Sequence, residues 1–170
     1  MILEMFGIGR QLYKNRIVGQ IIPDTNWILV SRKNFITCYI YCVYTPWRPI
    51  FIYNYGIAIS NDNGLFKTEL TSFRDNWFLE FTLKDKKANP FTSENVQVIF
   101  DNTTVHANIG KDAFAKGNKI GINLGENLLL SNYMKEDGGK QIIIKTENQE
   151  FNLSFYSIGF EKADSFAQNY

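Results

Sequence analysis

Apolar and polar residues alternate along most of the chain between Trp27 and Ile109, and again between Gln141 and Ser157. The segment 77–84 shows the pattern clearly, because its apolar row is Trp77, Leu79, Phe81 and Leu83. A period of two is typical of an antiparallel strand with one buried face. We therefore predict strands at about ten places: residues 27–33, 35–44, 50–59, 65–71, 77–84, 96–100, 103–109, 119–124, 140–146 and 150–157.

Tight turns and two short helices complete this pattern. Asn61-Asp62-Asn63-Gly64 and Asp101-Asn102 tolerate the positive φ of hairpin turns, so each is predicted to join two strands. A first helix is predicted where helical spacing replaces the alternation, at Leu128, Leu129 and Tyr133, joined by Leu130 and Met134. Gly138-Gly139 follows this group and is predicted to stop the helix. A second helix is predicted over 160–167, with one face formed by Phe160, Ala163 and Ala167.

The predicted fold is mainly β. We expect an antiparallel β-sandwich, or a barrel-like sandwich, of about eight to ten short strands with one or two short helices near the C-terminus. Residues 1–22 fit the strand pattern least and are predicted to form an N-terminal arm, as a short helix or a frayed segment. Residues 23–170 are predicted to form the single sandwich domain.

Composition narrows the classes of partner. The 170 residues are 45% apolar and 15% aromatic, enough for a large core, and this excludes a disordered chain. With 18 basic residues against 17 acidic ones, the net charge of +1 argues against nucleic acid as the main partner. We find neither an apolar run long enough for a transmembrane helix nor the residue order of an export signal at Met1, so the chain as written carries no visible export address.

Reactive side chains are scarce. Cys38 and Cys42 would lie about 13 Å apart on one face of a strand, too far for a disulfide, and are predicted to be buried thiols. His106 falls on the polar face of its strand.

Asp75 and Glu80 are the candidates for an acid–base pair, with a solvated surface position as the alternative. No motif for a metal or a cofactor occurs, so we predict no metal site, no cofactor and no enzymatic activity.

An aromatic-rich segment is the best candidate for a binding surface. Phe51, Tyr53 and Tyr55 share one strand face and Tyr39 and Tyr41 share another, which offers a shallow ring-lined surface for a sugar, a peptide or a protein. Packing of the same rings in the core is the alternative. The predicted aromatic stripe comprises Tyr39, Tyr41, Trp47, Tyr53 and Tyr55.

The order of the elements and three short stretches resemble the invasion-associated locus B family of bacteria over about residues 26–167. The N-terminal part of the resemblance lies in Trp27, Ser31 and Cys38, although the family has a cysteine where Ser31 stands. The C-terminal part lies in a helix, a Gly-Lys turn, two strands and a closing Gly-Phe-x-x-Ala motif: Leu128–Lys135, Gly138-Gly139-Lys140, Gln141–Thr146, Phe151–Ser157 and Gly159-Phe160-Glu161-Lys162-Ala163. The resemblance implies a small β-sandwich in the periplasm or envelope, with a role in host-cell contact and no catalytic centre.

These observations support three hypotheses. The leading one is a non-enzymatic β-sandwich protein that acts through protein interaction in the cell envelope or at the host-cell interface. The alternative is a cytosolic protein, similar to an immunity protein or an antitoxin, that binds a single partner toxin. A hydrolase that uses His106 is the third. The oligomeric state is left open.

Overall fold

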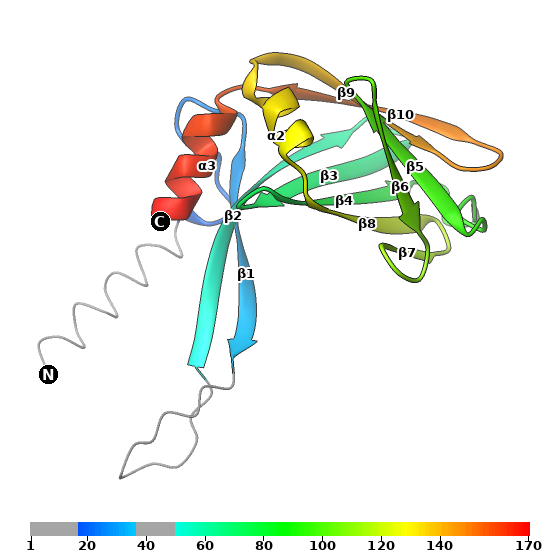
Figure 1. The fold of residues 1–170 in the computed structure, drawn as a ribbon, viewed down its shortest axis with the longest axis horizontal. Coiled ribbons are helices and arrows are strands. Elements are labelled where there is room, and N and C mark those ends of the chain that lie inside the picture. The colour runs from blue at the N-terminus through cyan, green and yellow to red at the C-terminus, as the bar shows by residue number, and fades with distance from the viewer. Residues whose placement is uncertain (1–16, 37–49) are drawn as a thin grey trace, which may run out of the picture.

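The computed structural model describes residues 17–36 and 50–170, shown in Figure 1. In chain order the described elements are β1 (Ile28–Ile36), β2 (Ile50–Asp62), β3 (Phe66–Phe73), β4 (Asn76–Leu83), β5 (Asn95–Phe100), β6 (Thr103–Asn108), β7 (Ala113–Lys116), β8 (Lys119–Glu126), α2 (Leu128–Lys135), β9 (Gly138–Lys145), β10 (Glu150–Ser157) and α3 (Phe160–Asn169). The mainly β prediction and the helices near the C-terminus are confirmed.

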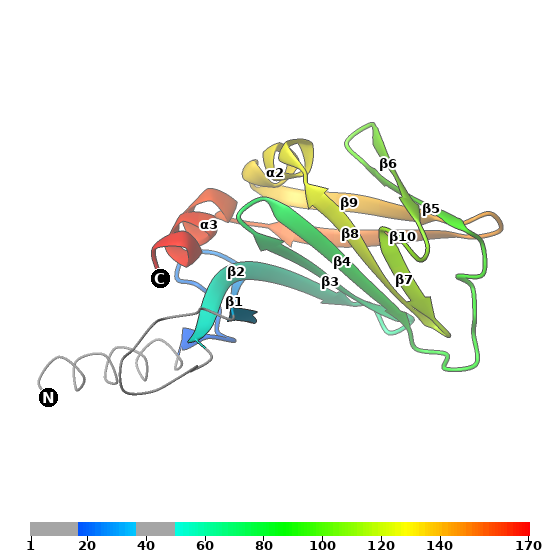
Figure 2. The same ribbon diagram turned by 60° about the horizontal axis from the view of Figure 1, so that its bottom comes forward.

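The strands form two antiparallel sheets. The first sheet has the order β1-β2-β3-β4-β8-β7, and the second has the order β10-β9-β5-β6. Figure 2 shows the two sheets as layers that lie over one another, and the described strands do not close into a barrel. The predicted sandwich is therefore confirmed in its open form.

Both predicted turns are confirmed. Asn63 Oδ1 accepts hydrogen bonds from the N–H groups of Leu65 and Phe66 at 3.0 Å each, and Gly64 has a φ of 86°. Asp101 and Asn102 join β5 to β6 with φ values of 44° and 60°, a conformation in which asparagine and aspartate cost less than other residues.

Two predicted boundaries were wrong, and one strand was not predicted. The break expected at Asn34 is absent, because Asn34 lies inside β1 and pairs with Ile52. The short strand β7 was not predicted, since four residues are too few to show an alternation. Gly138-Gly139 does not stop a helix but begins β9, because α2 has already ended at Lys135, before Glu136 takes an extended conformation.

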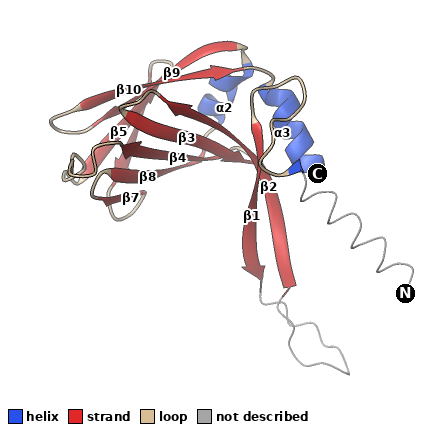
Figure 3. Ribbon diagram, turned by 180° about the vertical axis from the view of Figure 1, so that it is seen from behind, coloured by secondary structure: helices blue, strands red, loops and turns tan. Residues whose placement is uncertain are grey.

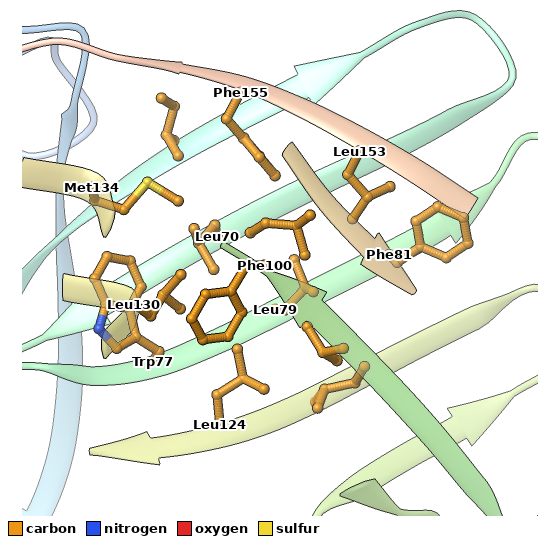
Figure 4. Close-up of a cluster of buried hydrophobic side chains, with 14 of the residues drawn as sticks. Leu70, Trp77, Leu79, Phe81, Phe100, Leu124, Leu130, Met134, Leu153 and Phe155 are labelled. Carbon is orange, nitrogen blue, oxygen red and sulfur yellow. The ribbon is translucent and has the colours of Figure 1, made fainter. Parts of the chain in front are cut away.

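The inward rows of the two sheets form the core. Figure 4 shows Leu70 and Leu79 of the first sheet facing Leu153 of the second, with Phe100 and Phe81 beside them. Each large apolar side chain that leaves water completely contributes about 1.5–3 kcal/mol to folding. The alternation read from the sequence thus corresponds to the buried rows of a two-layer core.

The two helices close one end of the sandwich. Asn127 caps α2 by accepting a hydrogen bond from the Leu130 N–H at 3.0 Å. α2 buries Leu130, Ser131 and Met134, whereas Leu128 and Leu129 are exposed, so only part of the predicted helical stripe faces the core. α3 buries the predicted face, which consists of Phe160, Ala163 and Ala167.

Two buried tryptophans link both helices to the sheets. Phe160 of α3 stacks on Trp77 at 5.6 Å between ring centroids and meets Trp27 edge-on at 5.3 Å. The Trp77 indole N–H donates to Ser131 Oγ of α2 at 2.9 Å, and the Trp27 indole N–H donates to Ser157 Oγ at 3.3 Å. Each buried indole therefore has the partner that its N–H group needs.

Two asparagines join the sheets along one seam. β10 is an end strand of its sheet, and its Ser154 and Tyr156 carbonyls accept hydrogen bonds from the side-chain amides of Asn61 and Asn26, respectively. The Asn26 side-chain oxygen in turn accepts from the Ile158 N–H at 2.7 Å. These contacts occupy part of an edge that would otherwise be open to another strand.

The end of the predicted N-terminal arm lies against the sandwich. Gly19 N–H donates to the Leu29 carbonyl at 2.7 Å, Leu29 N–H donates to the Gln20 carbonyl at 3.0 Å, and Ile22 is buried in the core. Residues 1–16 of the predicted arm lie outside the described residues.

One part of the first sheet projects from the sandwich. β2 pairs with β1 over residues 50–58 but with β3 only from Ile57 to Asp62. Its first half and the second half of β1 therefore form a two-stranded ribbon that extends away from the layers, as Figures 1 and 3 show. Gly56 lies where β2 crosses the end of β3, and a Cβ atom there would lie 2.4 Å from the Ser72 carbonyl oxygen and 2.6 Å from Phe73 Cδ1.

Replacing Gly56 by alanine tests this crossing. We expect Gly56→Ala to lower the free energy of unfolding by about 1–3 kcal/mol, because the backbone must shift to admit the methyl group. Urea denaturation followed by circular dichroism measures the change. Gly121→Ala is the control, since a Cβ at Gly121 of the same sheet meets no atom within 4 Å. Equal unfolding midpoints for the two variants would contradict the close approach.

Candidate functional site

A cavity of about 680 Å³ lies at the base of the ribbon. It is within the range of about 300–1,000 Å³ that is usual for ligand sites. The ribbon, the β3–β4 turn, β8 and the C-terminal end of α3 all contribute to its wall. We call it the ribbon cavity and define it by Arg32, Tyr53, Asn54, Tyr55, Phe73, Arg74, Asn76, Phe78, Asn123, Ala167, Gln168 and Tyr170.

Aromatic rings make up much of the wall. Tyr53 is 39% exposed, and Tyr55 meets Tyr170 of α3 edge-on at 4.9 Å between centroids. Burial raises the pKa of the Tyr55 hydroxyl, and the neighbouring Tyr53 adds to the effect. Tyr55 therefore keeps its proton at neutral pH and presents a neutral hydroxyl to the site.

The charged side chains in the wall are all of one sign. Arg32 and Arg74 are the two arginines of the described residues, and both line the ribbon cavity. The Arg32 guanidinium lies 5.5 Å from the centroid of the Phe78 ring. Within residues 17–36 and 50–170 neither guanidinium has a carboxylate within 4.0 Å, and the lining residues include no Asp or Glu. The wall is therefore suited to an anionic group.

Two carboxylates support the site from behind. Asp164 of α3 accepts a hydrogen bond at 2.7 Å from Gln168, which lines the cavity. Burial raises the pKa of Asp164, and the negative charge of Asp75 raises it further. Asp75 accepts a hydrogen bond from Ser131 Oγ at 2.8 Å, which ties the β3–β4 turn to α2, whereas the Asp164–Gln168 bond lies within α3.

The suggested acid–base pair of Asp75 and Glu80 is not assembled. Asp75 lies in the β3–β4 turn, and Glu80 is exposed five positions later, about 16 Å along an extended strand. The carboxylate that Asp75 influences is Asp164. No local pattern in the sequence signals that pairing, because the two acids are far apart along the chain.

The other residues singled out from the sequence fall into two groups. Tyr53 and Tyr55 of the aromatic stripe lie together in the ribbon cavity. Tyr39, Tyr41 and Trp47 lie outside the described residues, as do Cys38 and Cys42. His106 is exposed on β6 with Thr104 and Asn108, as the alternation predicted.

Sequence reasoning missed Arg32, Arg74, Phe78 and Tyr170 as members of the site. They come from β1, the β3–β4 turn, β4 and the end of α3. Nothing in their local pattern distinguishes them from ordinary surface or core positions. They meet only in the folded chain, where β2 continues past the end of β3 close to Gly56.

The fold and the cavity define a class: an open two-sheet antiparallel β-sandwich with a projecting ribbon and an arginine- and aromatic-lined cavity at its base. Comparisons with protein-family models, curated proteins and solved structures find no match to this chain. In the described part of the chain, no helix is long and apolar enough to cross a membrane, and no three His, Cys, Asp or Glu residues are grouped as metal ligands would be.

The raised pKa of Asp164 gives stability a defined dependence on pH. The pKa of Asp164 is higher in the folded state than its value of 3.8 in the unfolded chain, so the folded state binds the proton more tightly. The stability that this proton contributes is therefore lost as pH rises through the folded pKa. We expect Asp164→Asn to gain stability relative to the parent protein between pH 4 and pH 7. Thermal unfolding at a series of pH values measures the difference.

Asp101→Asn is the control for this prediction, because Asp101 is an exposed turn residue at which asparagine accepts the same positive φ. It is measured over the same series of pH values and shows the general effect of replacing an exposed aspartate by asparagine. Parallel stability curves for Asp164→Asn and the parent would show that Asp164 has no raised pKa.

Proposed function

We propose that this chain is a non-enzymatic binding protein that holds an acidic segment of a partner protein in the ribbon cavity. The observation that carries the proposal is the pair of guanidiniums, Arg32 and Arg74, which share one aromatic-lined cavity and have no carboxylate partner among the described residues. Arginine binds carboxylates through two parallel hydrogen bonds, so an acidic side chain of a partner completes the site.

The composition of the cavity supports binding over catalysis. Arginine and tyrosine are the residue types that most often dominate the energy of protein interfaces. The remaining polar groups are amides, from Asn54, Asn76, Asn123 and Gln168, and amides bind and orient other groups without transferring protons. The Tyr55–Tyr170 contact holds two of the rings in place before a partner arrives, which reduces the entropy lost on binding.

The partner belongs, in this proposal, to the cell envelope or the host-cell surface, in keeping with the resemblance to the invasion-associated locus B family. A cytosolic toxin is the alternative partner. An acidic segment complements the two arginines in either compartment, so the site does not depend on the location. Identification of the partner distinguishes the two.

A photo-crosslinking amino acid at position 53 tests the proposal in cells. We expect Tyr53→p-benzoylphenylalanine to give one discrete adduct, because Tyr53 lies in the cavity wall. The same substitution at Tyr156, an exposed ring on β10 outside this cavity, is the matched control. Adding Arg32→Glu and Arg74→Glu to the Tyr53 probe is expected to abolish the adduct, as detected by gel shift and mass spectrometry.

Titration with the purified partner measures how much each arginine contributes to the binding affinity. Loss of a charge-assisted hydrogen bond costs about 1.5–3 kcal/mol, so Arg32→Ala or Arg74→Ala is expected to weaken binding by roughly tenfold or more. Lys116→Ala, at an exposed lysine of β7, is expected to leave the Kd unchanged. Equal adducts at positions 53 and 156, or binding that is indifferent to both arginines, would refute the proposed site.

A further inference from the structure

A second cavity, of about 760 Å³, lies along the seam between β10 and the near edge of the first sheet. It shares no lining residue with the ribbon cavity. We call it the seam cavity and define it by the residues that carry the argument below: Ile21, Ile28, Tyr133, Lys140, Phe155 and Tyr156.

Lys140 is the unusual member of this cavity. It occupies the inward row of β9 with Ile142 and Ile144, which are fully buried, and is itself only 8% exposed. Its ammonium nitrogen lies 5.0 Å from the centroid of the Tyr133 ring. Among the described residues this ammonium nitrogen has no hydrogen-bond partner and no carboxylate within 4.0 Å.

Lys140 is one of the residues that line the cavity. Ser72 Oγ is the one fully buried side-chain polar atom of the described residues without a hydrogen bond. Lys140 Nζ also has no such bond and is not one of the fully buried polar atoms, so it keeps some accessible surface. A cation on a largely buried residue is stabilised when a counter-charge lies beside it.

The lining residues of the seam cavity include no Asp or Glu, so its single charge is positive. The remaining wall is largely apolar and partly open, with Ile21 62% exposed beside Ile28, Phe155 and Tyr156. An occupant of matching chemistry has one anionic group for Lys140 and an apolar part for the isoleucines and rings.

An extended peptide fits this seam less well. A strand that adds to β10 needs the free carbonyls of that edge, and the Ser154 and Tyr156 carbonyls already accept hydrogen bonds from the Asn61 and Asn26 side chains. The seam therefore favours a small amphiphile over an added strand.

We propose that the seam cavity binds a monocarboxylate with an apolar chain, such as a fatty acid, with its carboxylate on Lys140 and its chain against Ile21 and Ile28. The carboxylate supplies the counter-charge that the ammonium lacks, and the chain covers apolar surface that is now in water. This site acts independently of the ribbon cavity.

Titration of the full chain with octanoate, followed by ¹H–¹⁵N correlation spectra, tests the proposal. We expect saturable shifts confined to amides around Tyr133, Lys140 and Tyr156. Lys140→Met is expected to weaken octanoate binding by about tenfold or more. Lys145→Met, at an exposed lysine on the same strand, is the matched control and is expected to bind as the parent does.

Two further measurements separate a binding role from a structural one. Octylammonium, which has the same chain and the opposite charge, is expected not to bind the parent protein. Lys140→Arg, which keeps the charge, is expected to retain octanoate binding even if Lys140→Met fails to fold. Absence of saturable shifts, equal binding of octylammonium, or displacement of octanoate by an uncharged apolar pentapeptide would overturn the proposal.

Discussion

The packing of Phe160 against Trp27 and Trp77 is the contact on which the rest of the structure depends. It lies where both sheets and both helices meet, and each indole N–H is satisfied by a buried serine, one from α2 and one from the end of β10. Rings of this size contribute strongly to folding, but only if their polar ends find partners. By docking the first turn of α3, this contact also directs the helix so that Gln168 and Tyr170 reach the ribbon cavity.

The first sheet forms part of the sandwich and also the projecting ribbon, because β2 is longer than the neighbouring β3. Its second half pairs with β3 and belongs to the sandwich, while its first half continues past β3 as the ribbon. Glycine at position 56 allows the backbone of β2 to pass the Ser72 carbonyl and the Phe73 ring at a distance that excludes any Cβ atom. The continuation of one strand beyond its neighbour thus creates a concave corner, and the candidate binding site lies in that corner.

An overall charge of +1 conceals a marked local separation of charge. Acidic side chains such as Asp62, which binds both Lys67 and Lys84, take part in ion pairs at the surface. The ribbon cavity and the seam cavity instead have cationic side chains and no acidic side chains in their walls, arginines in one and a lysine in the other. Net charge therefore describes the solubility and long-range field of the chain, whereas specificity depends on which charges the fold leaves unpaired.

The sequence by itself determined the fold class, a mainly β antiparallel sandwich. The alternation that marks a strand and the residues that permit a hairpin turn act over a few positions, so both can be read locally. The apolar row around Trp77 and the Asp101-Asn102 turn are examples. The sequence also singled out Tyr53 and Tyr55, which line the ribbon cavity. Only the tertiary structure decided that Arg32, Arg74 and Tyr170 line the same cavity, and that Lys140 is largely buried beside a second one. The physical reason is that these residues meet through contacts between segments distant along the chain, which no local period encodes.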